Sequence, residues 1–284
     1  MSGVERRITL VDGHRVSYQV CGPEDGPPTV LVHGLASDST TWEYATAPLA
    51  ERGLRVIAVD LLGHGQSDKP RRSYLLEDFA AQLEAFFDAL QLKSATLVGH
   101  SLGGAIAVHF GYYYPERVDR LVLVSAGGLG REVSLALRAG ALPGAERIIG
   151  WAMGPRMRRL YAWPRLHRRL RLTPENVKNL RRLGAHLGEP DARHAFFAAL
   201  RGVIEPGGQR GSFLEMRYLA AHVPTLVVWA EGDVVIPVAH AHATQAHLAG
   251  SRLLVFPGGG HEPHRRHAAE FARSVADFIS DNEN

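Results

Sequence analysis

The segment 95–114 restricts what this chain of 284 residues can fold into more than any other. Its apolar start predicts a buried strand, and the small-residue segment after the turn predicts a helix, which Pro115 ends. Between the two, Ser101 stands between Gly99 and Gly103 at Gly-x-Ser-x-Gly spacing. Glycines at these positions remove the Cβ atoms that would collide where a helix follows a strand directly. The sequence therefore predicts a strand, a sharp turn and a helix.

A serine on such a turn has an accessible hydroxyl, because the strained backbone lifts its Oγ out of the sheet. The helix that begins there directs its unpaired N–H groups and the positive end of its dipole toward the space beside the serine. A negative charge on an attacked carbonyl would be stabilised in that space. Ser101 is therefore a candidate nucleophile. The alternative is a tight turn whose serine merely caps a helix.

Strand and helix patterns alternate along most of the chain. An antiparallel hairpin is predicted over 7–20, and buried strands over 28–32, 54–60, 95–99, 118–125, 225–230 and 252–256. Helices are predicted over 41–52, 76–90, 102–114, 238–248 and 264–280. This alternation predicts an α/β fold with a mostly parallel eight-stranded sheet flanked by helices.

The pattern changes between residues 127 and 223, where we expect helices and loops but no strand. We interpret 1–126 and 224–284 as two parts of one domain, with 127–223 as a helical insertion after the sixth strand. The insertion carries ten more basic than acidic residues, and arginines are dense over 156–171. We favour a solvated arginine face there. Capture of an anionic acyl substrate, and contact with a membrane or an anionic carrier, are the less favoured alternatives.

Composition narrows the classes of function. The single cysteine, Cys21, excludes an internal disulfide and a two-cysteine zinc or redox motif. The start has no apolar signal-peptide core, and no run approaches the length of a membrane span, so a cytoplasmic location is predicted. The net charge is +3 and no nucleic-acid recognition motif accompanies it, so no nucleic-acid partner is predicted. We expect neither a metal nor a cofactor.

A serine needs a base to take its proton, and the base needs a partner that orients it. Two later strand ends offer these groups: Asp233 follows the strand 225–230, and His261 follows the last strand within a glycine-rich loop. Because the carboxyl ends of parallel strands lie at one edge of a sheet, these side chains can meet Ser101. Glu231 and Asp60 are the rival carboxylates.

With these motifs the chain resembles the α/β-hydrolase superfamily over nearly its whole length. The match comprises His33-Gly34-Leu35, the glycine-punctuated loop 60–68, the serine turn, and the aspartate and histidine loops, in the order Ser, Asp, His. The resemblance implies that Ser101 is the nucleophile, that His261 is the general base and then acid, and that Asp233 orients it. It implies an oxyanion hole from the backbone N–H groups of Leu35 and Leu102. The insertion resembles the family's cap.

The resemblance also implies a small-molecule substrate beneath the cap. The residues expected to contact the substrate are His33, Gly34, His100, Trp163 and His264. The expected reaction is cleavage of an ester, thioester or lactone with a fairly apolar acyl part. Carbon–carbon bond hydrolysis of the meta-cleavage-product type is one alternative, although those enzymes usually have tryptophan where Glu262 follows His261. A ligand-binding, non-hydrolytic member is another, and the chain can be a monomer or a homodimer.

Overall fold

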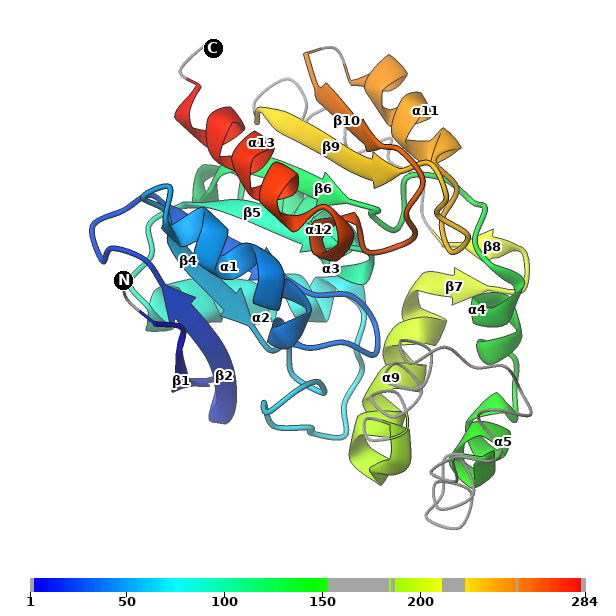
Figure 1. Cartoon of the computed structure of the whole chain (residues 1–284). Helices are drawn as coiled ribbons and strands as arrows, with labels where there is room; N and C mark the ends of the chain where they lie inside the picture. Colours follow the sequence, from blue (N-terminus) through cyan, green and yellow to red (C-terminus); the bar gives the residue numbers. More distant parts are fainter. Residues whose placement is uncertain (1–2, 153–183, 185–186, 211–222, 249, 282–284) are drawn as a thin grey trace, which may run out of the picture.

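The computed structural model describes residues 3–152, 184, 187–210, 223–248 and 250–281 (Figure 1). An eight-stranded sheet forms its body, in the spatial order β1-β2-β4-β3-β5-β6-β9-β10. The strands are β1 (Glu5–Val11), β2 (His14–Cys21), β3 (Pro28–Val32), β4 (Arg55–Val59), β5 (Ala95–His100), β6 (Val118–Val124), β9 (Thr225–Ala230) and β10 (Arg252–Phe256). The predicted fold class is confirmed.

The direction of the strands decides where a site can form. β2 pairs antiparallel with β1 and with β4, whereas every other neighbouring pair in the sheet is parallel. The carboxyl ends of β3, β5, β6, β9 and β10 therefore lie at the same edge. Ligands of such sheets bind beyond that edge.

Helices cover both faces of the sheet (Figure 1). One face carries α1 (Glu43–Ala50), α12 (Pro263–Arg266) and α13 (Ala268–Ser280), and the other carries α2 (Leu76–Ala89), α3 (Leu102–Tyr113) and α11 (Ala239–His247). Two helices differ from expectation. The predicted helix 41–52 begins as a 3-10 turn, Ser39–Trp42, and the predicted helix 264–280 is divided at His267, whose backbone leaves the helical region (φ −117°, ψ 39°).

Each face of the sheet has its own apolar core because alternate strand residues point to opposite sides. Phe79, Phe86 and Phe110 fill the side of α2 and α3. Trp42 and Phe271 fill the side of α1 and α13. The two cores fix the strands from both sides, so the loops at their carboxyl ends start from rigid positions.

The chain between β6 and β9 forms α4 (Leu135–Gly140), α5 (Ala145–Ala152), α9 (Pro190–Val203), β7 (Ile204–Glu205) and β8 (Gly208–Gln209). The expectation that this insertion contains no strand was wrong, since β7 and β8 pair as a hairpin. Strands of two residues are too short to show an alternating pattern. The arginine-dense stretch 156–171 and Trp163 lie outside the described residues. None of the described helices is long and apolar enough to cross a membrane.

Candidate active site

Ser101 sits on a strained turn between β5 and α3, with φ 54° and ψ −116°. Backbone hydrogen bonds hold this conformation: the Ser101 N–H donates to the Val124 carbonyl at 3.0 Å, and its carbonyl accepts from Gly104 at 3.0 Å and from Gly127 at 2.8 Å. A residue at positive φ persists only where its surroundings fix it in this way. The turn thus presents the serine hydroxyl at the carboxyl edge of the sheet.

Gly103 shows why the turn needs glycine. A Cβ on Gly103 would lie 2.2 Å from the carbonyl oxygen of Val32, and a Cβ on Gly99 would lie 2.3 Å from the carbonyl oxygen of Gly103. Real Cβ atoms do not approach this closely, so α3 can pack against β3 and β5 only without these side chains. The spacing of the motif is therefore a packing requirement.

Ser101, His261 and Asp233 are joined by hydrogen bonds, although 160 and 28 residues separate the bonded pairs. The Ser101 Oγ lies 2.9 Å from Nε2 of His261, and Nδ1 of His261 lies 2.9 Å from Oδ2 of Asp233. With the Nδ1 proton donated to Asp233, Nε2 is free to accept the serine proton. The structure thus brings together the three side chains that the sequence suggested.

Asp233 is held as a buried carboxylate. Its side chain is fully buried. Its Oδ1 accepts hydrogen bonds from the backbone N–H groups of Val235 at 2.9 Å and Ile236 at 3.0 Å. Burial works to raise the pKa of Asp233, but the hydrogen bond and charge of His261 and the two backbone donors outweigh it and hold the pKa below its usual value. Asp233 therefore stays ionised beside the imidazole.

The rival carboxylates face other partners. Asp60 is fully buried, accepts the Ser39 N–H at 2.7 Å and pairs with Arg6 at 3.0 Å. Glu231 accepts the Gly258 N–H at 3.3 Å, at the start of the histidine loop. Both carboxylates support loops of the site, and neither contacts His261.

Leu35 and Leu102 line the same cavity as Ser101. Leu102 is the first residue of α3, so its N–H has no acceptor within the helix. The position before Leu35 is Gly34, where a Cβ would lie 3.0 Å from the Cβ of Ser101. This close approach brings the backbone after Gly34 beside the serine. The arrangement suits two N–H donors on one oxyanion.

His33, His100 and His264 are buried and do not belong to the described cavity wall. His33 bridges the Gly34 carbonyl at 2.8 Å and the Leu61 N–H at 3.1 Å. His264 lies 3.2 Å from the Thr41 hydroxyl and packs its ring on that of Trp42. These contacts support the site, and the expected contact of the three side chains with a substrate stays a prediction.

His100 has a specific partner: its Nε2–H donates to the backbone carbonyl of His261 at 2.7 Å. Burial, and then the neighbouring charge of His261, lower the pKa of His100 to about 3. The ring is therefore neutral, with its proton on Nε2.

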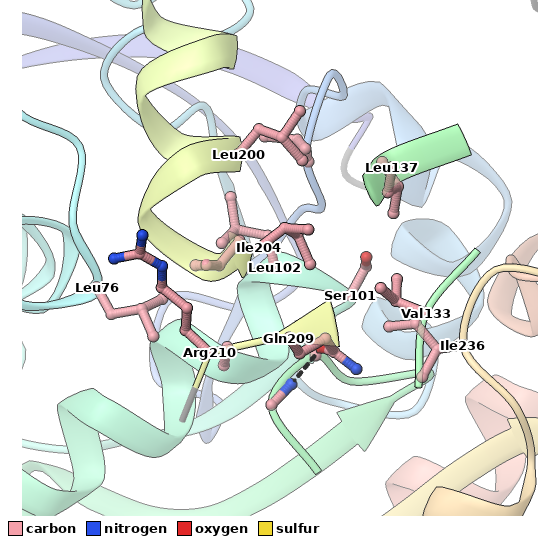
Figure 2. A pocket seen from close by; sticks show the side chains of 15 residues that line it. Leu76, Ser101, Leu102, Val133, Leu137, Leu200, Ile204, Gln209, Arg210 and Ile236 are labelled. Carbon is pink, nitrogen blue, oxygen red and sulfur yellow. Dashed lines mark hydrogen bonds between the residues drawn. The ribbon is translucent and has the colours of Figure 1, made fainter. Parts of the chain in front are cut away.

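A cavity opens in front of Ser101 (Figure 2). The fold supplies part of its apolar wall, and the insertion supplies the rest through Val133, Leu137, Leu200, Val203 and Ile204. Gln209 and Arg210 also line it, and sequence reasoning missed both because no motif marks them. No group of three His, Cys, Asp or Glu residues in the described part of the chain is arranged to hold a metal ion.

Comparison with known proteins agrees with this architecture. A family model described as alpha/beta hydrolase fold matches residues 27–268, and the chain belongs to that family. The predicted family is thereby confirmed. The catalytic roles of the individual residues remain predictions.

Among particular proteins, an uncharacterized protein of Mycobacterium tuberculosis is 38% identical over 98% of this chain and 82% of its own length. A meta-cleavage product hydrolase from Pseudomonas fluorescens IP01, solved as a mutant complexed with acetates, has a TM-score of 0.76 at 23% identity, covering 99% of both chains. The enol-lactonase from Burkholderia xenovorans LB400 has a TM-score of 0.73 at 21% identity, covering 97% of this chain and 100% of its own.

Proposed function

We propose that this protein is a serine hydrolase that cleaves an ester, thioester or lactone of a fairly apolar small molecule. The observation that carries the proposal is the hydrogen-bonded chain from Ser101 through His261 to Asp233, with Ser101 on the wall of an apolar cavity. A hydroxyl, an imidazole and a carboxylate in this order are the groups that acyl transfer needs.

In the first half of the reaction, the Ser101 Oγ attacks the substrate carbonyl carbon while Nε2 of His261 takes the hydroxyl proton. The carbonyl oxygen becomes an oxyanion, which accepts the N–H groups of Leu35 and Leu102. The intermediate then collapses. The bond to the leaving oxygen or sulfur breaks, His261 returns its proton to that atom, and the acyl group stays on Ser101.

Water completes the reaction. His261 takes a proton from a water molecule, whose oxygen attacks the acyl carbon, and the acid leaves as the proton returns to the Ser101 Oγ. Asp233 keeps His261 in the required tautomer and stabilises its positive charge in both halves. Burial of Asp233 strengthens this effect because little water screens it.

Turnover of p-nitrophenyl butyrate by wild type and Ser101→Ala tests the proposal. We expect wild type to hydrolyse the ester and the variant to lose at least about a thousandfold in kcat. A fluorophosphonate probe should label only wild type, and equal circular dichroism spectra would show that the variant folds. Undiminished turnover by Ser101→Ala would reject the assignment. Ligand binding without labelling or turnover would favour a non-hydrolytic member of the family.

Carbon–carbon bond hydrolysis is the second candidate, supported by the whole-length likeness to a meta-cleavage product hydrolase. Those enzymes usually have tryptophan directly after the catalytic histidine, whereas this chain has Glu262 there, which accepts a hydrogen bond from Thr41 at 3.3 Å. We therefore rank carbon–carbon bond hydrolysis below ester hydrolysis. Assays of a vinylogous diketone and an ester with the same enzyme preparation would separate the two. A dienoate product with negligible ester turnover would reverse the ranking.

A further inference from the structure

Arg210 is the only described residue of the cavity wall that carries a full charge. Most of the remaining lining residues are apolar or glycine, and the other two polar side chains, Ser101 and Gln209, are neutral. An anionic group in the cavity would be attracted to this charge.

The neighbouring Gln209 uses both ends of its amide within the protein. Its Oε1 accepts a hydrogen bond from the Gly128 N–H at 2.7 Å (Figure 2). Its Nε2 donates to the Glu132 carbonyl at 3.1 Å. A ligand that displaced either partner would leave a backbone group unpaired, which is costly. Among the described lining residues, Arg210 is the charged side chain that an anionic ligand would meet.

None of the described carboxylates pairs with the guanidinium of Arg210. The carboxylates around the hairpin are engaged elsewhere: Glu205 pairs with Arg131 at 3.1 Å, and Glu132 pairs with His240 at 2.8 Å. Among the described residues, none forms an ion pair or hydrogen bond with the Arg210 side chain. Its backbone is nevertheless fixed, since the Arg210 N–H donates to the Val203 carbonyl at 2.8 Å.

Figure 2 shows Arg210 and Ser101 on opposite sides of the cavity, with Leu102 and Ile204 between them. A molecule whose carbonyl lies at Ser101 would therefore pass over apolar side chains before it reaches the guanidinium. Arg210 is exposed, so the group that it binds can keep part of its hydration. A carboxylate fits this position because the planar guanidinium can donate two parallel hydrogen bonds to it.

We propose that Arg210 selects substrates whose acyl part carries a carboxylate, separated by an apolar segment from the carbonyl that Ser101 attacks. This inference rests on the proposed hydrolase function and names its substrate class. The preferred substrates are half-esters of dicarboxylic acids and molecules of the same layout.

Two p-nitrophenyl esters of equal length test this selectivity: the octanoate, which ends in a methyl group, and the octanedioate half-ester, which ends in a carboxylate. In Arg210→Gln, kcat/KM for the half-ester should fall at least about tenfold, the loss expected for a hydrogen bond to a charged group. For the octanoate it should stay within about twofold. Arg210→Lys should retain part of the preference, and added salt should reduce it in wild type only.

Arg273→Gln is the matched control, because it removes the same charge from the exposed side of α13. It should leave both kcat/KM values unchanged. An equal effect of Arg210→Gln on both esters, or no effect on either, would overturn the proposal.

Direct binding separates this proposal from the hydrolase function. If wild type turns over neither ester, the proposed function fails, but calorimetric titration with octanamide and with the half-amide of octanedioic acid still tests Arg210, because only the second ligand carries a carboxylate. Tighter binding of the half-amide by wild type that is lost in Arg210→Gln would support the carboxylate site. Equal binding of the two amides would reject it.

Discussion

The Nε2–H of His100 donates to the backbone carbonyl of His261 across 2.7 Å, so the residue before Ser101 holds the residue that we propose as its base. The loop that carries His261 begins with three glycines, 258–260, of which Gly258 and Gly259 have φ of 62° and 76°. Glycines give such a loop little rigidity of its own. The hydrogen bond from His100 therefore fixes the backbone where catalysis would need it fixed.

Replacing His100 by phenylalanine should keep a ring in the site but remove the donor. We expect kcat for an ester to fall about 10- to 100-fold with little change in KM, because a displaced imidazole loses alignment with Ser101 while the cavity stays intact. His100→Gln, whose amide can donate from nearly the same place, should recover most of kcat. Equal losses in the two variants would show that the ring itself, and not its hydrogen bond, is required.

The same residue makes stability depend on pH. The pKa of His100 is about 3 in the folded protein against 6.5 for an unperturbed histidine, so between these values only the unfolded chain binds the proton. The free energy of unfolding should therefore fall as the pH is lowered from 8 to 5, by roughly 2 kcal/mol from this group.

Urea unfolding of wild type and His100→Gln at pH 8 and pH 5 measures that contribution. The variant should lose less stability than wild type over the interval, by about that amount. Asp233 does not interfere, because its lowered pKa keeps it ionised at pH 5. The same loss in both proteins would contradict a buried neutral His100.

Gln209→Leu should weaken the junction between the insertion and the fold. The substitution leaves the Gly128 N–H and the Glu132 carbonyl without their partner, at a cost of about 1–3 kcal/mol for each group that stays buried. We expect a lower melting temperature and a higher KM, because the hairpin also lines the cavity. Gln245→Leu, on the exposed side of α11, is the control and should leave both values unchanged. An unchanged melting temperature for Gln209→Leu would argue against the junction.

The residues that meet at the site were predictable where a physical requirement leaves a trace in the sequence. Ser101 needs glycines on both sides, and Asp233 and His261 each follow a buried strand. Side-chain direction leaves no such trace. His100 adjoins the serine in sequence, yet it points to the histidine loop and not into the cavity.

The cavity wall shows the same limit. Leu200 and Ile204 are ordinary apolar residues in sequence, and only the packing of α9 and β7 over the sheet edge places them on the cavity wall with Ser101. Gln209 belongs to a strand of two residues, too short to give a pattern, and Arg210 directly follows it. The proposed reactive groups could therefore be predicted, whereas the surface that would choose their substrate could not.

Gly127 opens the insertion, and its N–H donates to the carbonyl of Ser101 at 2.8 Å. The insertion, which lines part of the cavity, is thus hydrogen-bonded to the backbone of the proposed nucleophile itself. A chimera that exchanges the insertion with that of a relative keeps this bond when the two sequences join after Gly127. A graft joined before Gly127 would have to reproduce the bond, or it would alter the serine turn along with the choice of substrate.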